Sequence, residues 1–258
     1  MDMKVGDIWH IIISFYTKNC YNQTMLKICI VLPVYNEETD LPKNLPILHK
    51  FLQKNISTPW KLIIADNGST DRTSRIGRQL AESYSHVQYR RINRAGRGLA
   101  LKTTWLENSV DIYGYMDIDL STSLIDILPM IDSISKGFDL AIGNRLSPSA
   151  NTKRSFKREI LSRTYNLLLK IFFRINFSDA QCGCKFISRT VQKNVLPHIR
   201  NEQWFFDTEL LILASQKKYK IFEQPVSWQD DPHTKVRIIP TIANDLSGMW
   251  QLKFRTHD

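Results

Sequence analysis

The stretch Tyr115-Met116-Asp117-Ile118-Asp119 closes an apolar run that begins near residue 112. Side chains of an extended strand alternate between its faces, so Asp117 and Asp119 point the same way and can converge on one divalent cation where the strand ends. Carboxylate oxygens suit Mg²⁺ or Mn²⁺, and these cations usually complete their shells with water and nucleotide phosphates. Solvated surface turns also contain such pairs, so the surrounding sequence has to decide between a metal site and a turn.

Apolar runs and helical patterns alternate along the first 145 residues. The strand-like runs span residues 27–34, 60–65, 87–92, 112–116 and 138–143, and apolar residues recur at helical spacing within 45–52, 76–80, 99–107 and 124–135. Near-continuous apolar runs are typical of parallel strands that are covered on both faces. The alternation predicts an α/β fold, Rossmann-like, with a mostly parallel central sheet flanked by helices.

The ends of these strands carry the polar residues. Ligands of open α/β sheets bind beyond the carboxyl ends of the strands, and segments 33–37, 94–98 and 117–119 fall there together with Asp66. Two glycines and two arginines within 93–98 could approach an anion closely. Gly68 permits a sharp bend after Asp66, and Thr70 or Asp71 can cap the helix that follows.

Seven segments carry a resemblance to a known family. They are Leu32-Pro33-Val34-Tyr35-Asn36-Glu37, Asp66-Asn67-Gly68-Ser69-Thr70-Asp71, residues 93–98, Asp117-Ile118-Asp119-Leu120-Ser121, Ile142-Gly143-Asn144-Arg145, Asp179-Ala180-Gln181-Cys182-Gly183-Cys184-Lys185 and residues 204–209. With these segments the chain resembles family 2 glycosyltransferases of the GT-A fold over about residues 27–237. More narrowly, it resembles the dolichyl-phosphate glucosyltransferases and dolichyl-phosphate mannose synthases, and segments 179–183 and 204–207 favour the glucosyl branch.

The resemblance implies a nucleoside diphosphate sugar as donor, with UDP-glucose favoured and GDP-mannose next. Asp66 would hydrogen-bond the base, while Asp119 would ligate a Mg²⁺ or Mn²⁺ ion that bridges the two phosphates and stabilises the departing diphosphate. Asp117 would share the metal and face the ribose. Ser121 stands where mannose synthases tend to carry Gln as a further metal ligand. The donor-site residues implied are Pro33, Tyr35, Glu37, Asp66, Arg97, Asp117 and Lys235.

The resemblance also implies a polyprenyl or dolichyl phosphate as acceptor. A phosphate monoester is already an anion at neutral pH, so it needs positioning and charge compensation more than a general base. Arg145 follows the strand after the metal motif, and Arg158 and Ser162 lie one helical turn apart on a helix expected to start near residue 155. These three residues would hold the acceptor phosphate, because arginine's planar fork suits phosphate oxygens. Arg158 could instead belong to a solvated basic helix face.

Asp207 has two interpretations. Many family 2 enzymes place their general base in a segment of this type, whereas mannose synthases, which share the lipid-phosphate acceptor, work without one. A basic role for Asp207 would indicate a soluble or glycan hydroxyl as acceptor. Asp207 could equally be the N-cap of the helix expected over the apolar run 210–214.

The chain of 258 residues is long enough for one large α/β domain. We expect an N-terminal extension at 1–26, a GT-A domain at 27–237 and a C-terminal helical segment at 238–258. Within the domain, residues 27–145 would bind the nucleotide sugar and residues 146–237 the acceptor.

The net charge of +10, from 35 basic and 25 acidic residues, favours an anionic partner, either a nucleic acid or a membrane surface. A basic nucleic-acid-binding module would explain the charge but not the Asp-x-Asp motif, and no aromatic RNA-recognition signature is evident. We therefore expect no nucleic acid partner. The sequence leaves the oligomeric state open.

Segment 156–177 is apolar with basic flanks, as in a helix that lies in a membrane interface. The apolar side chains expected to contact lipid include Leu168, Phe172 and Phe173, and the basic ones include Arg163, Lys170 and Arg174. The segment could equally be a core helix with a basic outer edge, and residues 236–254 are a second candidate for membrane contact. No run near the N-terminus approaches the ~20 residues of a spanning helix. We expect a cytoplasmic protein bound peripherally to the cytosolic face of a membrane.

Overall fold

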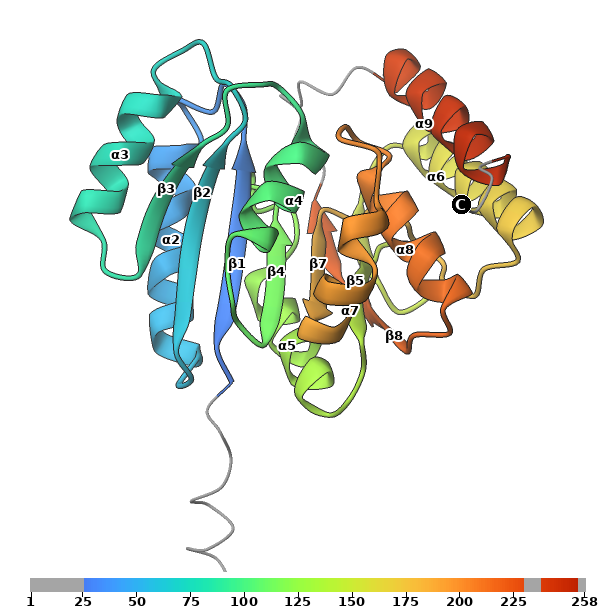
Figure 1. Ribbon diagram of the computed structural model, residues 1–258, viewed down its shortest axis with the longest axis horizontal. Helices are drawn as coiled ribbons and strands as arrows, with labels where there is room; N and C mark the ends of the chain where they lie inside the picture. The colour runs from blue at the N-terminus through green and yellow to red at the C-terminus, as the bar shows by residue number, and fades with distance from the viewer. Residues whose placement is uncertain (1–25, 230–237, 255–258) are drawn as a thin grey trace, which may run out of the picture.

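The computed structural model describes residues 26–229 and 238–254 of the chain. Its centre is a seven-stranded sheet in the order β3-β2-β1-β4-β7-β5-β8 (Figure 1). The strands of this sheet are β1 (Ile28–Val34), β2 (Trp60–Asp66), β3 (Val87–Arg91), β4 (Ile112–Met116), β5 (Leu140–Asn144), β7 (Cys184–Ser188) and β8 (Ile221–Pro225). Two short parallel strands, β6 (Asn151–Lys153) and β9 (Ser227–Gln229), form a second sheet.

Strands β1 to β4 pair in parallel, and β5 pairs in parallel with β8. All residues of β1 except the half-buried Pro33 are buried, because helices cover both faces of the sheet. The predicted α/β class with a mostly parallel sheet flanked by helices is therefore confirmed. The five strands expected from apolar runs are β1, β2, β3, β4 and β5.

Strand β7 was not expected from the sequence, and it lies antiparallel between β4 and β5. Lys185 is the second residue of β7 and is fully buried, so a charged side chain interrupts the apolar pattern by which the other strands were found. The register pairs Cys184 with Met116 at the end of β4. Strand β7 thereby brings the segment that precedes it next to the Asp-x-Asp motif.

The helices form two layers around the sheet (Figure 1). They are α2 (Leu41–Asn55), α3 (Thr73–Ser83), α4 (Arg97–Leu106), α5 (Ile127–Ser135), α6 (Phe156–Phe173), α7 (Arg189–Asn194), α8 (Phe206–Gln216) and α9 (Ile238–Lys253), with 3₁₀ turns at Leu124–Asp126 and Leu196–His198. Alternate residues of β1, such as Ile30 and Leu32, pack with α2 and α5. Cys29 and Val31 face the opposite layer, which contains α4, α7 and α8.

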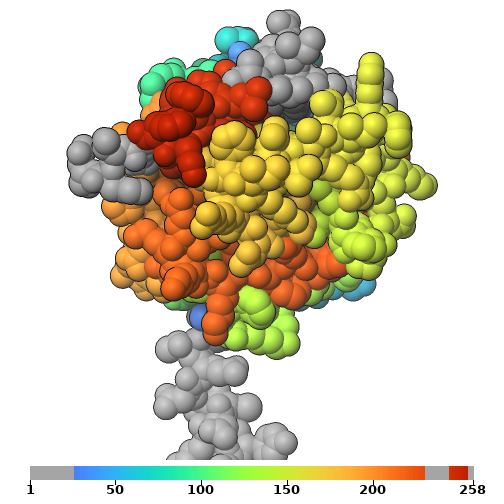
Figure 2. Space-filling model, turned by 90° about the vertical axis from the view of Figure 1, so that its right-hand side faces the viewer, coloured from blue at the N-terminus to red at the C-terminus, as the bar shows by residue number. Residues whose placement is uncertain are grey.

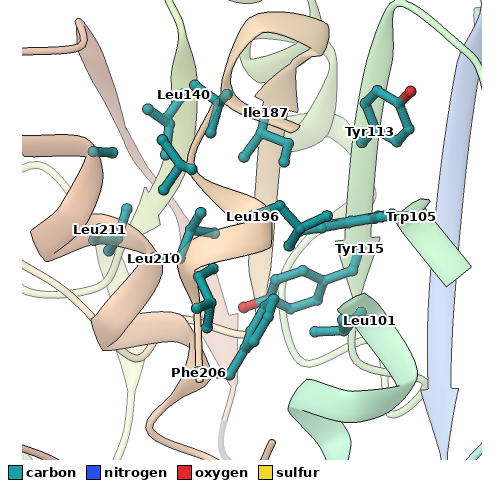
Figure 3. Packing of buried hydrophobic residues seen from close by; sticks show 14 of the residues in the cluster. Leu101, Trp105, Tyr113, Tyr115, Leu140, Ile187, Leu196, Phe206, Leu210 and Leu211 are labelled. Atoms are coloured by element: carbon teal, nitrogen blue, oxygen red, sulfur yellow. The ribbon is translucent and has the colours of Figure 1, made fainter. Parts of the chain in front are cut away.

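An aromatic cluster joins β4 to the layer of α4 and α8. Trp105 of α4 lies 6.1 Å from both Tyr115 of β4 and Phe206 of α8, measured between ring centroids. Figure 3 shows Tyr115 extending from β4 into the space between Leu101 and Phe206. This packing fixes the position of the Tyr115 hydroxyl, which matters for the site described below.

Helices α6 and α9 lie side by side on the outer face of the second half (Figure 2). The Lys253 ammonium near the end of α9 donates a hydrogen bond of 2.8 Å to the Phe172 carbonyl oxygen of α6. No helix within residues 26–229 or 238–254 combines the length and the hydropathy that crossing a membrane requires.

A buried carboxylate connects α9 to the body of the domain. Asp245 is buried, and its Oδ2 accepts a hydrogen bond of 2.6 Å from Gln181 Nε2, while its Oδ1 has no hydrogen-bond partner among the described residues. The pKa of Asp245 is raised to about 7, chiefly by burial; the hydrogen bond from Gln181 lowers it and the negative charge of Asp207 raises it. Between about pH 4 and pH 7 the folded protein therefore holds a proton on Asp245 that the unfolded chain releases.

We expect Asp245→Asn to stabilise the protein at pH 8 and to do so less at pH 5. The folded pKa of this carboxyl lies above its unfolded value of about 3.9, so the free energy of unfolding falls as pH rises between the two values. The amide of asparagine carries no charge at any of these pH values, like the protonated carboxyl. The gain in free energy of unfolding at pH 8 should be about 4 kcal/mol, from roughly three pKa units at 1.36 kcal/mol each. Urea unfolding of both proteins at pH 5 and pH 8 measures it. An equal difference at both pH values would contradict the expectation.

Candidate active site

The turn after β2 is organised around Asp66, which is fully buried. Its Oδ1 accepts a hydrogen bond of 2.8 Å from the Ser69 backbone. Its Oδ2 accepts hydrogen bonds from the Ser74 hydroxyl at 2.5 Å, the Tyr89 hydroxyl at 2.6 Å and Arg91 Nη1 at 2.7 Å. Burial alone would raise the pKa of Asp66, but the hydrogen bonds from Ser74, Tyr89 and Ser69 outweigh it and lower the pKa. Four donors thus surround Asp66, and three of them share Oδ2.

Two asparagines lie beside this turn. Asn67 is largely buried; its backbone donates a hydrogen bond of 3.0 Å to the Val34 carbonyl oxygen, but its side-chain amide makes none to the residues that the structure describes. The Asn36 side chain accepts a hydrogen bond of 2.8 Å from the Thr70 backbone, and the Asn36 backbone donates one of 3.0 Å to Ser69 Oγ. Asn36 has a φ of 56°, a left-handed conformation that asparagine adopts more readily than most residues. These bonds join the loop after β1 to the turn after β2.

Of the other residues predicted for the donor, Pro33 lies in β1 and Tyr35 and Glu37 lie on the loop after it, whereas Arg97 begins α4 and Asp117 follows β4. Pro33 is half-buried near the end of β1, Tyr35 is exposed, and the Glu37 backbone donates a hydrogen bond of 2.7 Å to Thr73 Oγ1. They share the edge at which β2 and β4 end, because these strands are parallel to β1. Lys235 lies outside the described residues.

The Asp-x-Asp motif forms a tight turn beyond β4. The Asp117 backbone donates a hydrogen bond of 3.0 Å to the Gly183 carbonyl oxygen, and Leu120 adopts a φ of 52°. A Cβ atom on Gly183 would lie 1.8 Å from Asp117 Oδ2, so only glycine at position 183 leaves room for that carboxylate. Asp119 is exposed, and its Oδ1 accepts a hydrogen bond of 2.9 Å from the Ser121 backbone. Gly183 therefore decides how Asp117 is placed beside Asp119.

This pair of carboxylates fits a particular kind of metal site. Within the described ranges, no group of three or more histidine, cysteine, aspartate or glutamate side chains is arranged to hold a metal ion by itself. Mg²⁺ and Mn²⁺ need only one or two carboxylates when water and a diphosphate supply the remaining oxygens. Asp119, which is exposed, and one oxygen of Asp117 are suited to such an ion.

Arg97 ties Asp117 to a second carboxylate. Helix α4 begins at Arg97, two residues earlier than predicted, so this arginine belongs to the helix and not to the preceding glycine-containing loop. Its guanidinium donates to Asp117 Oδ1 at 2.8 Å and to Asp207 Oδ2. The same group lies 4.7 Å from the ring centroid of Tyr115 and 5.0 Å from that of Trp204. With a side chain only 8% exposed, Arg97 positions both carboxylates from inside the protein.

Asp207 is not the helix cap that one interpretation predicted. The N-cap of α8 is Phe205, and Asp207 lies in the first turn with its side chain buried. Its carboxylate accepts hydrogen bonds from Arg97 and from the Tyr115 hydroxyl, and Lys185 Nζ lies 3.2 Å from Oδ1. Burial alone would raise the pKa of Asp207, but the charges of Lys185 and Arg97 outweigh it and lower the pKa.

The sequence predicted no role for Lys185, which lies in the motif at 179–185. It is fully buried on β7, and its ammonium donates to the Tyr115 hydroxyl at 3.0 Å and to the Cys182 carbonyl oxygen at 2.7 Å. Lysines are rarely buried unless they are paired. A lysine between apolar residues of a strand was therefore the one sequence signal that could have indicated a buried ion pair. Lys185 and Arg97 together hold Asp207 in its ionised form.

Arg145 lies at the end of β5, as predicted, and it is already paired. Its Nε and Nη2 donate to the two carboxylate oxygens of Asp179 at 2.8 and 2.9 Å. Its guanidinium carbon lies 5.5 Å from the ring centroid of Trp228. The third nitrogen of the guanidinium, Nη1, has no hydrogen bond within the described ranges, so Arg145 can still offer a donor to an anion.

Arg158 and Ser162 lie on α6. Arg154, which precedes this helix and was not predicted for the acceptor site, contacts both of them. Arg154 Nη2 donates hydrogen bonds of 2.7 Å both to the Arg158 carbonyl oxygen and to Ser162 Oγ. The Arg154 guanidinium carbon lies 5.7 Å from the Trp228 ring centroid. Arg145 and Arg154 are thus brought together beside Trp228, and Ser162 contacts Arg154. The basic residues at 153–163 offered no way to single out Arg154 from its neighbours in the sequence.

Known proteins resemble this chain in sequence and in fold. The model of glycosyl transferase family 2 matches residues 29–196. The chain is 30% identical over 237 residues to "Glycosyltransferase AglD" of Haloferax volcanii, a match that covers 89% of this chain and 38% of that protein. It is 29% identical to the dolichyl-phosphate beta-glucosyltransferase of Saccharomyces cerevisiae, over 81% of this chain and 69% of that protein. The human enzyme of the same name is 26% identical over similar shares. The chain therefore spans just over a third of the length of the archaeal relative.

Solved structures show the same architecture. Glucosyl-3-phosphoglycerate synthase from Mycobacterium tuberculosis, in complex with Mn²⁺, UDP and its product, superposes with a TM-score of 0.65 at 18% identity. The superposition covers 90% of this chain and 81% of that one. The predicted resemblance, the GT-A fold and the assignment as a glycosyltransferase are confirmed. The chain belongs to glycosyl transferase family 2.

Proposed function

We propose that the protein transfers a hexose, with glucose from UDP-glucose favoured, to the phosphate of a polyprenyl lipid such as dolichyl phosphate. An acceptor phosphate oxygen would form a bond to the anomeric carbon as the bond from that carbon to the UDP oxygen breaks, which inverts the configuration. The names of the yeast and human relatives support this choice of sugar and acceptor.

The state of Asp207 carries the proposal. A hydroxyl acceptor requires a general base, and Asp207 was the residue predicted for that role. In the structure two cationic groups and a tyrosine hydroxyl engage its carboxylate, and its pKa is lowered. A carboxylate in this condition is a weak base for a sugar hydroxyl, because proton transfer is most effective when the pKa of the base lies near the working pH. An acceptor phosphate needs no such base.

The donor site would use the edge formed by the loop after β1, the turn after β2 and the Asp-x-Asp motif. Asp119 and Asp117 would hold Mg²⁺ or Mn²⁺, which stabilises negative charge on the departing diphosphate when bound. Pro33, Tyr35 and Glu37 would surround base and ribose. Because Asp66 already accepts four hydrogen bonds, the neighbouring Asn67 amide is better suited to pair with the base.

The pH dependence of transfer tests whether the acceptor is a phosphate. We expect kcat/KM for the lipid to rise through the second ionisation of the acceptor phosphate, at about pH 6, and to stay level above it. The corresponding lipid phosphonate ionises at higher pH and should move this rise upward. A rise that keeps its position with both acceptors would assign it to a group of the protein and contradict the proposal.

The proposed lipid acceptor calls for contact with a membrane, and the surface of α6 and α9 supports it. Phe156 is 79% exposed and Ile171 is 66% exposed, and together with Ile160 and Leu167 they follow one stripe of α6. Trp250 of α9 is also 66% exposed. Figure 2 shows these two helices adjoining on one face. We propose that this face rests on the cytosolic surface of a membrane.

The structure corrects which side chains of α6 could do this. The sequence interpretation assigned Leu168, Phe172 and Phe173 to the lipid side. Leu168 and Phe173 pack against the core, whereas Phe172 is 43% exposed. The lipid-facing stripe therefore starts from Phe156, and the basic residues Lys170 and Arg174 near the end of α6 are exposed beside it.

Liposome flotation tests this face. Phe156→Ser combined with Ile171→Ser should reduce flotation with anionic vesicles at low salt, because apolar burial and basic residues near the surface act together in interfacial binding. Ile47→Ser is the matched control, since Ile47 is 54% exposed on α2, in the opposite half of the sheet. Rising salt should release the parent protein progressively. Equal flotation of the double variant and the control would contradict a role for the α6 stripe.

A further inference from the structure

Arg154 is a buried arginine just before α6. Its side chain is 6% exposed, and its Nε and Nη1 have no hydrogen-bond partner among the described residues. The Glu159 carboxylate is nearby, with Oε2 at 3.3 Å from Nη1, but the two atoms do not form a hydrogen bond and Oε2 is also without a partner. Buried polar groups in proteins are almost always hydrogen-bonded, so two unpaired donors on one buried guanidinium need an explanation.

A second arginine lies close to the first. Arg145 and Arg154 have guanidinium carbons at 5.5 and 5.7 Å from the same Trp228 ring centroid. Burial and the charge of Arg145 lower the pKa of Arg154, and they outweigh the charges of Glu159 and Asp179, which raise it. Asp179 neutralises Arg145 through two hydrogen bonds. Arg154 forms an ion pair with Glu159, which also pairs with Arg163, but Nε and Nη1 of Arg154 make no hydrogen bond there.

The location of this charge points to its ligand. Ser227 and Gln229, on either side of Trp228 in β9, are hydrogen-bonded to the chain just after the Asp-x-Asp motif, with Ser123 N–H to Ser227 O at 2.9 Å and Gln229 N–H to Ser121 O at 3.0 Å. Strand β6, which ends immediately before Arg154, pairs with β9. The unpaired N–H groups of Arg154 are therefore connected, through β6 and β9, to the loop that would bind the diphosphate of the nucleotide sugar. A phosphate monoester would accept hydrogen bonds from Nε and Nη1 of Arg154 and from Nη1 of Arg145, and it would offset both charges.

We propose that Arg154 is a further ligand of the acceptor phosphate, acting with Arg145 beside Trp228. This inference rests on the proposed function, because it adds a residue to the same acceptor site. It also revises the expected set: Ser162 Oγ accepts a hydrogen bond from Arg154, so Ser162 orients this arginine.

Calorimetric binding of farnesyl monophosphate, with farnesol and 3-phosphoglycerate in parallel and with UDP and Mn²⁺ present, tests the proposal. Arg154→Gln should weaken binding of farnesyl monophosphate at least tenfold, while the affinity for UDP changes less than twofold. Arg75→Gln, which removes an exposed arginine of α3, should bind like the parent. Unchanged binding by Arg154→Gln would overturn the proposal, as would a parent protein that binds neither phosphate compound.

Two further variants distinguish a phosphate-binding role of Arg154 from a purely structural role in its ion pair with Glu159. Glu159→Gln should keep or raise the affinity for farnesyl monophosphate, since it removes a competing carboxylate; a loss equal to that of Arg154→Gln would overturn the proposal. Arg154→Met should unfold at a urea concentration no lower than the parent in the absence of ligand. A clearly lower midpoint would show that Arg154 serves stability and contradict a ligand role.

The same titrations distinguish this inference from the proposed function. Arg154-dependent binding of farnesyl monophosphate without transfer of glucose to dolichyl phosphate would sustain the phosphate site and refute the proposed reaction. Arg154-dependent binding of 3-phosphoglycerate alone would sustain the site and assign it to a water-soluble phosphate. Transfer to dolichyl phosphate that is equally efficient in Arg154→Gln would sustain the reaction and refute the inference.

Discussion

Asp119→Asn is expected to reduce kcat for sugar transfer by about 10³-fold with little effect on stability. Asp119 is exposed beyond β4, so its replacement removes no packing, whereas a metal that stabilises the departing diphosphate contributes several kcal/mol and each 1.36 kcal/mol is tenfold in rate. EDTA should reproduce the loss in the parent protein. Initial rates with saturating UDP-glucose and dolichyl phosphate, with and without added Mn²⁺, measure both effects.

Asp132→Asn is the matched control for this change. Asp132 is also an exposed aspartate, and it pairs with Lys136 on α5. Its replacement should leave kcat within twofold of the parent. Full turnover of the parent in EDTA without added metal would contradict the metal-dependent mechanism, whatever the effect of Asp119→Asn.

Arg97→Met is expected to lower the free energy of unfolding by about 3 kcal/mol, because removing one partner leaves buried carboxylates without compensation. In this variant Asp207 keeps its contacts with Lys185 and Tyr115. The loss of stability should therefore fall at the lower end of the range of about 3 to 5 kcal/mol for removing one partner of a buried ion pair. Asp117 would lose its hydrogen bond from the guanidinium, and binding of UDP with Mn²⁺ should weaken as well. Urea unfolding and UDP titration measure the two consequences.

Arg90→Gln provides the comparison for Arg97→Met. Arg90 pairs with Glu107 through two hydrogen bonds, but the two side chains are 47% and 43% exposed. Exposed ion pairs contribute at most about 1 kcal/mol, so this variant should unfold close to the parent. If both variants lost the same stability, the buried network around Arg97 would not hold the site together as described.

The parts of the fold that follow from local pattern could be predicted from the sequence. Continuous apolar runs marked β1, β2, β4 and β5, and turns after them marked the edge at which ligands bind. The Asp-x-Asp motif could be placed at that edge because its strand is unambiguous. These features depend on residues that are neighbours in the chain, which is the range over which hydrophobic periodicity is informative.

The contacts that set the chemistry could not be predicted in the same way. Lys185, Arg97 and Asp207 are separated by many residues in the chain, and β7, which carries Lys185, lacks a continuous apolar run. Whether Asp207 was a base, a cap or a paired carboxylate depended on which cations the fold brought to it. A charged residue acquires its partners through tertiary packing, which a single sequence does not reveal.

Helix α6 illustrates a smaller difference of the same kind. Its apolar residues were correctly placed on a helix that begins at Phe156, next to the expected start. Because apolar residues lie on several sides of α6, the pattern did not decide which side faces the core. Leu168 packs inward while Leu167 is exposed, so the two neighbouring leucines have opposite environments.

Transfer of labelled sugar to lipid tests the central claim most directly. The full chain is incubated with Mn²⁺, dolichyl phosphate and either radiolabelled UDP-glucose or radiolabelled GDP-mannose, and the organic phase is counted after extraction. We expect label from UDP-glucose in the lipid phase, dependent on dolichyl phosphate and absent with dolichol. Label that remains in the aqueous phase, or that reaches dolichol as readily as its phosphate, would contradict a glucosyltransferase that uses a polyprenyl phosphate acceptor.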